Sequence, residues 1–217
     1  MKKLYVLILT LVLLFSLNGC GENANQNLPM AYVEKIENGS ALFKKASATD
    51  FTPLQIKTNL SEGDTIRTDD KTEVLLRFST GAVTRILPNS DFQLKERKLA
   101  QTGQTTVYTR LLKGIAYFYV PKGNNGAKKF EVETNRAIAS IKGTKFRVET
   151  NKEKTTLAVG EGLVEFMDKQ SKKSVEVGKL KSADVTEKGV SEAYASNSMD
   201  DAYFYDIKFK IMSKTGK

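Results

Sequence analysis

The sequence predicts an all-β protein built as a single domain. Beyond residue 30 the chain repeatedly alternates apolar and polar residues with a period of two, its apolar positions are rich in β-branched and aromatic residues, and Gly, Asn, Asp or Pro separate the alternating segments. No segment of this region shows a convincing long helical period. The 217 residues allow one ordinary core, and 40% apolar with 27% charged residues is typical of a globular chain.

The first twenty residues differ from the rest of the chain. Lys2 and Lys3 precede an apolar stretch from Leu4 to Leu17 that contains no charge, which is typical of an export signal. This stretch of 14 residues is shorter than the roughly 20 residues that a helix needs to cross a bilayer. We therefore expect residues 1–19 to be a cleaved signal peptide, in preference to a retained membrane span.

The end of the signal is more specific. Leu17-Asn18-Gly19-Cys20 resembles the lipobox of bacterial lipoproteins, in which the cysteine is acylated and becomes the first residue of the mature protein. The alternative is a cysteine that merely ends the apolar stretch. Cys20 is the only cysteine, so an internal disulfide is excluded. Two or more acyl chains would hold the protein stably on a membrane, because each buried methylene contributes about 0.8 kcal/mol.

Residues 20–30 are polar and poor in bulky side chains, which predicts a flexible acylated spacer before the folded body. Gly21 stands where many lipoproteins carry an aspartate that retains them in the inner membrane, so we favour the outer membrane where one is present. The expected location is thus the bacterial cell envelope.

The expected β domain spans residues 31–190. Strands are predicted at 72–78, 82–87, 115–120, 129–134, 145–150, 155–159 and 163–167. Several strands follow a glycine at uneven spacing, which predicts a twisted, solenoid-like or rolled sheet, with an antiparallel β-sandwich as the alternative. Residues 191–217 form a C-terminal tail, in which the alternation over 200–212 predicts a final strand.

An ordered set of motifs resembles the FecR domain, a family of exported bacterial domains. The set begins with the turn at 62–68, continues through the strand, glycine and strand of 72–86 and the segment Ile141-Lys142-Gly143-Thr144, and ends with 155–166. The resemblance covers about residues 33–180 and departs from the family at Thr80, Asn135 and Ser140, which touch turns more than the core. Sigma-regulating members carry a cytoplasmic helix and a transmembrane helix before the exported part. This chain shows neither pattern, so the signalling role is not transferred with the fold.

Several catalytic designs are excluded by composition. The chain contains no histidine, so it cannot build a Ser-His-acid triad, a Cys-His pair or a histidine-containing metal site. Asp69-Asp70 and Asp200-Asp201 are adjacent acids, but neighbours on a strand point to opposite faces, and turn chemistry explains them better than a glycosidase pair. We expect no catalytic residue, no cofactor and no metal.

Two short segments supply candidate binding residues. Alternation places Tyr117 and Tyr119 on one face of their strand and Phe118 on the other, so Phe118 is expected in the core and the tyrosine pair is a candidate binding surface. Gly143 is expected to allow a backbone geometry or close approach that a side chain would prevent. Lys142 and Lys145 are expected to face solvent, and an anion site at this turn is the functional alternative.

The net charge of the chain limits which classes of partner are expected. The formal net charge is +9, and without residues 1–19 there remain 32 basic and 25 acidic residues, a net charge of +7. For an exported chain we expect no nucleic-acid partner; an acidic protein, an anionic envelope surface or a glycan fits the charge, unless the lysines only solvate the surface. The function expected is that of a membrane-anchored lipoprotein with a FecR-like ligand-binding, protein-binding or scaffold domain. The alternatives are an envelope sensor that engages a receptor or regulator and a surface adhesin for host or glycan ligands.

Overall fold

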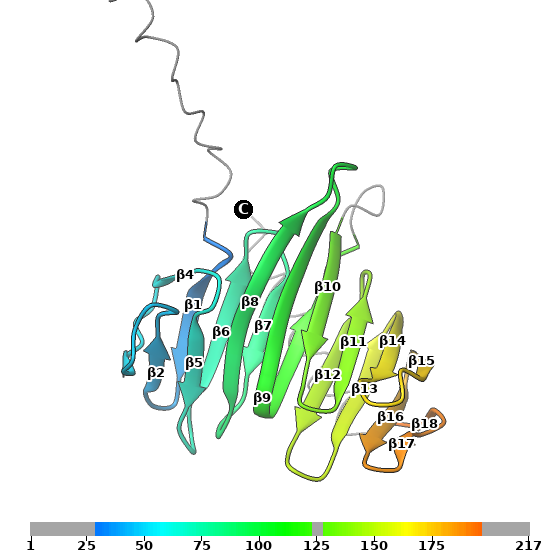
Figure 1. The fold of residues 1–217 in the computed structure, drawn as a ribbon. Helices are drawn as coiled ribbons and strands as arrows, with labels where there is room; N and C mark the ends of the chain where they lie inside the picture. The colour runs from blue at the N-terminus through cyan, green and yellow to red at the C-terminus, as the bar shows by residue number, and fades with distance from the viewer. Residues whose placement is uncertain (1–28, 123–127, 197–217) are drawn as a thin grey trace, which may run out of the picture.

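The structure is a computed structural model that describes residues 29–122 and 128–196 (Figure 1). The predicted signal peptide at 1–19, the acylation site Cys20 and the predicted strand at 200–212 lie outside the described residues. Every regular element in the described ranges is a strand, which confirms the all-β fold class. These ranges hold no helix of the length and apolar character that crossing a membrane requires.

Eighteen strands occur in the described residues. They are β1 (Ala31–Glu37), β2 (Ala41–Lys44), β3 (Thr52–Pro53), β4 (Asn59–Leu60), β5 (Thr65–Thr68), β6 (Glu73–Phe78), β7 (Val83–Ile86), β8 (Asp91–Leu99), β9 (Thr105–Tyr119), β10 (Lys128–Glu133), β11 (Ala137–Ile141), β12 (Lys145–Thr150), β13 (Thr155–Glu161), β14 (Leu163–Asp168), β15 (Ser174–Gly178), β16 (Lys181–Thr186), β17 (Gly189–Val190) and β18 (Tyr194–Ala195).

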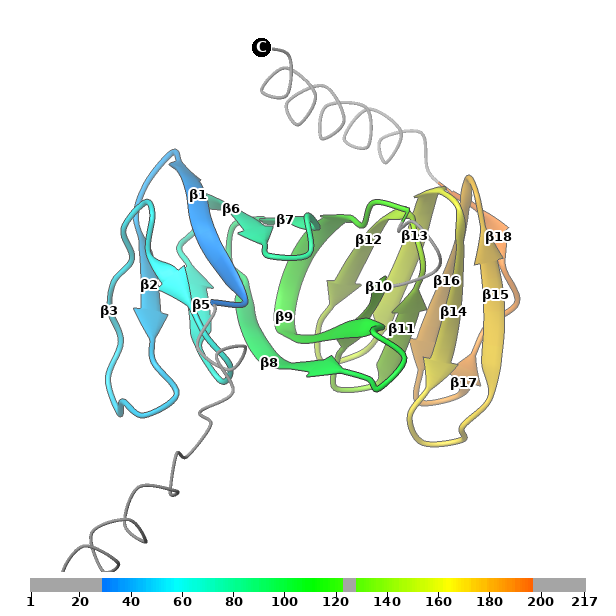
Figure 2. The ribbon, with the colours of Figure 1, turned by 90° about the horizontal axis from the view of Figure 1, so that it is seen from above.

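The strands form one continuous sheet that is rolled into two layers (Figure 2). Layer A contains β1, β4, β6, β7, β12, β13, β16, β17 and β18. Layer B contains β2, β3, β5, β8, β10, β11, β14 and β15. The long strand β9 belongs to both, since its first part pairs with β8 and β10 and its last part with β7 and β12.

One coil of the chain explains the predicted solenoid-like character. After β9 has crossed from layer B to layer A, the chain returns to layer B, where β10 lies parallel to the first part of β9. The other pairings among the described strands are antiparallel. The result is a rolled sheet that contains a single solenoid-like turn.

The bend in β9 depends on a glycine. Gly114 has a φ of +92°, and a Cβ atom at this position would lie 2.1 Å from the Ser90 hydroxyl oxygen. The same hydroxyl accepts the amide hydrogen of Ile115 at 3.0 Å. Glycine is therefore required here both for the backbone angle and for the close approach of Ser90.

The core lies between the two layers and is rich in phenylalanine. The ring of Phe118 stacks on that of Phe146 with 4.7 Å between centroids, and it lies 5.8 Å from the ring of Phe130. Phe130 in turn contacts Phe78 edge to face at 5.2 Å. These rings come from β6, β9, β10 and β12, so they join the two layers. The prediction that Phe118 belongs to the core is confirmed.

Buried hydroxyl groups close the end of this core near the turn between β10 and β11. The hydroxyl of Thr155 lies 2.9 Å from the hydroxyls of both Thr134 and Thr150. The Thr134 oxygen also accepts the amide hydrogen of Ala137 at 2.9 Å, which satisfies the turn. Because these groups are buried, their mutual hydrogen bonds remove the cost of leaving polar atoms unpaired.

Two predicted turns have the expected chemistry. Gly143, between β11 and β12, has a φ of +68°, and a Cβ atom there would lie 2.5 Å from the Cγ atom of Lys122. Asp69 accepts the amide hydrogens of Lys71 at 2.9 Å and Thr72 at 2.7 Å. Hydrogen bonds from the Thr72 side chain and the Lys71 amide lower the pKa of the Asp69 carboxyl to about 2. Asp69 thus serves a turn, as its sequence context indicated.

Candidate functional site

Three of the four predicted binding residues lie together on the outer side of layer A. Tyr119 is the cross-strand partner of Lys145, and Tyr117 is the partner of Arg147. Lys142 lies apart from them, in the turn between β11 and β12, and is exposed. The structure therefore brings the tyrosines and Lys145 into one neighbourhood on β9 and β12.

The expected exposure of this neighbourhood is wrong for two residues. Tyr117 does point away from Phe118, but it is only 5% exposed, and Leu87, Ile115 and Tyr119 are among the side chains that pack against it. Lys145 is only 9% exposed, and its ammonium group donates to the Glu161 carboxylate at 2.6 Å. Alternation fixes which side of a strand a residue takes, but neighbouring side chains decide whether solvent reaches it.

We define the Tyr117 face as the outward side chains of β7, β9, β12 and β13. Its members are Val83, Arg85, Ile115, Tyr117, Tyr119, Lys145, Arg147, Glu149, Thr156 and Ala158. Arg85 and Arg147 flank Tyr117 as its cross-strand partners. Arg85 forms an ion pair with Glu73, and Arg147 pairs with Glu149 at 2.5 Å. The face is therefore a closely packed mixture of aromatic rings and paired charges.

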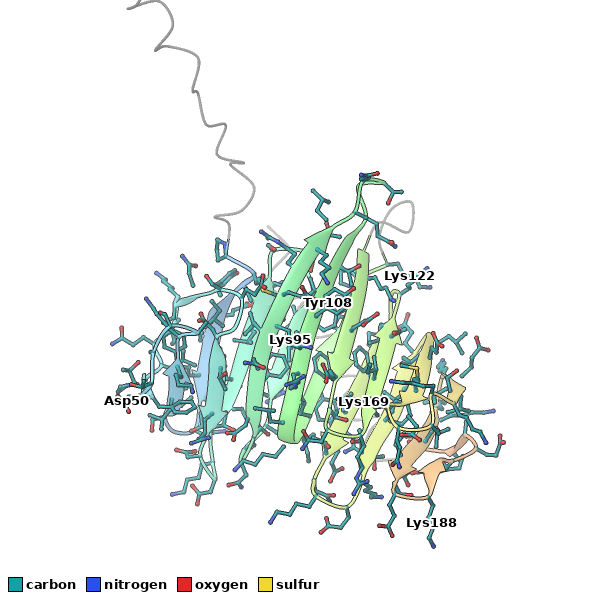
Figure 3. All side chains as sticks on the ribbon, in the orientation of Figure 1. Asp50, Lys95, Tyr108, Lys122, Lys169 and Lys188 are labelled. Atoms are coloured by element: carbon teal, nitrogen blue, oxygen red, sulfur yellow. The ribbon has the colours of Figure 1, made fainter. Side chains whose placement is uncertain are left out.

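A second cluster lies on the outer side of layer B, around the carboxylate of Glu133 at the end of β10. Lys95 of β8 donates to it at 2.6 Å, Arg110 of β9 at 2.8 Å, and Lys169 from the turn after β14 at 2.5 Å. Figure 3 shows Lys95 and Lys169 on this side of the molecule, together with Tyr108. We call Glu133 and these three cations the Glu133 cluster.

The electrostatics of the Glu133 cluster leave positive charge in excess. Burial alone would raise the pKa of the Glu133 carboxyl, but hydrogen bonds and charge from Lys169, Lys95 and Arg110 lower that pKa to about 2. One carboxylate cannot neutralise three cations or accept all of their N–H groups. The side chains of the cations also keep about a third of their surface in solvent. The cluster can therefore attract an anionic group.

A polar depression of about 240 Å³ adjoins the cluster and shares Lys169 with it. It is also lined by Asn135, Arg136, Asp168, Gln170 and Thr186. The Arg136 guanidinium donates to the backbone oxygen of Lys152 at 2.9 Å. Hydrogen bonds from the Ser171 side chain and from turn amides lower the pKa of the Asp168 carboxyl. Within the described ranges no group of three acidic, Cys or His side chains is placed to hold a metal ion.

The Glu133 cluster was not predicted from the sequence. Its four residues are far apart along the chain and come from three strands and a turn. The available signal was the alternation in β10, which places Lys129, Glu131 and Glu133 on the outer side and Phe130 and Val132 in the core. That pattern marks a charged outer row but does not reveal which cations lie beside it.

Part of the chain that carries these two outer faces matches a known protein family. Residues 64–165 match the family model described as FecR protein. This segment is a FecR domain. It contains β5 to β13 and the start of β14, and so it supplies the Tyr117 face and all of the Glu133 cluster except Lys169. The resemblance predicted from the ordered motifs is thereby confirmed.

Two solved structures resemble this chain in fold. Two crystal structures from Parabacteroides distasonis ATCC 8503, each described as a "putative anti-sigma factor", align with TM-scores of 0.52 and 0.51. In both cases the identity is 16%, and the alignment covers 62% of this chain and 61% of the other chain. At this identity the similarity shows the fold alone. No curated protein matches the sequence.

Proposed function

We propose that the chain is a lipid-anchored envelope protein whose FecR domain binds a partner without catalysing a reaction. One observation carries this proposal: a FecR domain follows, in one chain, an export signal and a lipobox-like segment ending at Cys20. Acylation at Cys20 would tether the domain to a membrane surface. The domain would then work by contact, through the side chains on its two outer faces.

The start of the folded body limits the reach of the tether. The amide of Met30 donates to the Leu60 oxygen at 2.9 Å, and the Met30 oxygen accepts from the Ser79 amide at 2.9 Å. Met30 follows Cys20 by ten residues, which span at most about 35 Å when fully extended. An acylated Cys20 would therefore keep the FecR domain close to the membrane and its partners within the envelope.

The Glu133 cluster and the adjoining depression form the contact surface of this proposal. Their excess positive charge favours an acidic protein surface, and the paired geometry of Lys95, Arg110 and Lys169 holds the cations in place. A net charge of +7 after loss of residues 1–19 would also speed encounter with an acidic partner at low ionic strength.

Anchoring is tested by growing cells with a clickable fatty acid and comparing the wild type with Cys20→Ser. The wild type is expected to carry the label and to sediment with membranes. The Cys20→Ser variant is expected to lose the label, because it lacks the only thiol. An unlabelled, full-length wild-type protein in the cytosol would overturn the proposal.

Partner binding is tested by pull-down from native envelopes with wild type, Lys95→Glu and the matched control Lys98→Glu. Both lysines lie on β8, and both substitutions change the charge equally. Lys98 pairs with Glu96 at 2.9 Å outside the Glu133 cluster. We expect Lys95→Glu to capture at least tenfold less partner than the wild type. Lys98→Glu is expected to capture as much as the wild type. Equal capture by all three proteins would rule out the cluster as the contact surface, and capture of a glycan or lipid alone would rule out a protein partner.

A second candidate function is regulatory. The two similar solved structures are each described as a "putative anti-sigma factor". In that case the partner is a receptor or regulator of envelope signalling. Deleting the gene is expected to change transcription of a sigma-dependent set of genes, and the wild-type copy to restore it. A transcriptome that is unaltered by deletion would exclude the regulatory role. Release of the domain by protease from intact cells would favour the adhesin alternative.

A further inference from the structure

The outer side of layer A contains apolar residues that are as buried as the core. Val83 is 1% exposed and Ala158 is 0% exposed, although neither belongs to the main core cluster. Their cross-strand partners Tyr119 and Arg147 also point away from the core. In Figure 2 no described strand lies over this side of layer A. A sheet face with this character is typical of one that another segment covers.

The described chain ends beside this face. The strand β18 pairs with β16, and the amide of Ser196 donates to the Leu180 oxygen at 3.0 Å. The hydroxyl of Ser196 lies 2.9 Å from that of Ser182, which is the cross-strand partner of Ala158. The described residues therefore end beside Ser182, at one end of a cross-strand row that continues over Ala158, Arg147, Tyr117 and Arg85.

The tail separates its acids from its lysines, and the face also changes in charge along this row. The cations Arg147 and Arg85 come first from the exit point. The row then continues to Leu75 and Lys35. The acids Glu73, Glu34 and Glu37 lie beside its far end on β6 and β1, where Arg85 and Arg77 pair with them. In the tail the acids come first, at Asp200, Asp201 and Asp206, and the lysines follow, at Lys208, Lys210, Lys214 and Lys217. A tail that runs along the row would place opposite charges together.

Residues 197–217 also have enough apolar side chains and enough length to cover the Tyr117 face. It contains Tyr203, Phe204, Tyr205, Ile207, Phe209 and Ile211 within nine positions. The distance from β16 to β1 is six strand spacings, roughly 29 Å. The 21 residues of the tail span roughly 31 Å as a helix and about 70 Å when extended. Either conformation can therefore reach across the Tyr117 face.

We propose that residues 197–217 dock on the Tyr117 face of the same chain. The apolar residues of the tail cover Val83, Tyr117 and Ala158, its aspartates lie near Arg147 and Arg85, and its lysines lie near the acids of β6 and β1. The docked tail covers part of the outer side of layer A. The outer side of layer B, with the Glu133 cluster, then remains open to a partner.

Photocrosslinking in the full chain tests this contact. A benzoylphenylalanine is placed at position 207 in a Cys20→Ser background, and the irradiated protein is mapped by mass spectrometry. We expect an intramolecular adduct on peptides from β7, β9, β12 or β13. The same crosslinker is also placed at positions 203 and 211 in separate proteins. The proposal would be overturned by adducts confined to layer B or by adducts to a second copy of the chain. It would also be overturned if none of the three positions gave an adduct.

Tyrosine nitration supplies a second readout that does not depend on one crosslinking geometry. In Ile207→Glu the nitration rate of Tyr117 is expected to rise about tenfold, because a charge in the apolar part of the tail opposes docking. The matched control Ser213→Glu adds the same charge to the tail and is expected to leave Tyr117 protected. Tyr108, on the opposite side of the molecule, should react equally in all three proteins, and far-UV circular dichroism should be unchanged. Equal protection of Tyr117 in Ile207→Glu would contradict docking.

Discussion

The outer sides of the two layers carry similar residue types in different surroundings. On layer A, the side chains of Arg85 and Arg147 are 12% and 14% exposed. On layer B, Lys95, Arg110 and Lys169 are 34%, 32% and 31% exposed. Both faces contain ion pairs and a central tyrosine, and both follow from the same alternation. The comparison shows that an outward position on a strand is not equivalent to a solvated one.

The difference has an energetic consequence. Charges that solvent reaches are screened, so ion pairs around Glu133 contribute modestly to stability and remain available for binding. Charges on the Tyr117 face are less hydrated, so each depends more strongly on its partner. We therefore expect substitutions on layer A to affect mainly stability and those on layer B to affect mainly binding.

The largest expected effect comes from the core that both layers share. Phe118→Ala should lower the free energy of unfolding by about 3–5 kcal/mol, because it removes a fully buried ring in contact with Phe146 and Phe130. Urea denaturation measures the change. Tyr119→Ala, one position along β9 on the outer side, is the control and should cost less than half as much. Equal losses would contradict the assignment of the two sides.

The next effect comes from the bend that lets β9 serve both layers. Gly114→Ala should cost about 2–4 kcal/mol, because it combines a positive φ with a clash against Ser90. Gly103→Ala is the control: its φ is +77° but no atom lies within 4 Å of the added Cβ, so we expect about 1 kcal/mol. Thermal unfolding compares the two. A smaller loss at Gly114 than at Gly103 would show that the bend tolerates a side chain.

A direct comparison of the two faces uses one tyrosine from each. Tyr117→Ala should cost about 1–3 kcal/mol because the ring is almost fully buried against Leu87 and Ile115. Tyr108→Ala should cost less than about 1 kcal/mol, since its ring is half-buried and lies 5.3 Å from the Lys98 ammonium group. Chemical denaturation of both variants measures the two losses in the free energy of unfolding. A Tyr108 loss equal to or above that of Tyr117 would reverse the comparison.

The smallest expected effect is pH-dependent. Glu133→Gln should cost about 1–2 kcal/mol near neutral pH, after allowance for the solvent that screens its cations. Because the pKa of Glu133 is lowered in the folded protein to about 2, its contribution is complete above the ordinary value of 4.5 and is lost as the pH falls through 2. Denaturation curves between pH 7 and 2 should therefore converge for the two proteins. A difference that stays constant down to pH 2 would contradict this assignment.

Much of the strand pattern could be predicted from the sequence. The strands expected at 72–78, 145–150 and 163–167 correspond to β6, β12 and β14, whose core-facing residues alternate without interruption. The strand β8 was missed because a bulge between Leu94 and Glu96 breaks the period of two. In its segment Asp91–Leu99 charged residues also dilute the apolar pattern.

The candidate sites were predictable only in part. Alternation correctly placed Tyr117 and Tyr119 opposite Phe118, but it could not show that Tyr117 is covered or that Lys145 pairs with Glu161. The Glu133 cluster was not predictable, because its cations reach one carboxylate only when the sheet has been rolled.

The sequence alone determined the all-β class, the core position of Phe118 and the need for glycine at 143, because these follow from the period of a strand and from local backbone geometry. The tertiary structure decided the shared role of β9, the burial of Tyr117 and the three cations that meet at Glu133. Those features depend on contacts between residues distant in the chain, and such contacts are set by how the whole sheet rolls and packs.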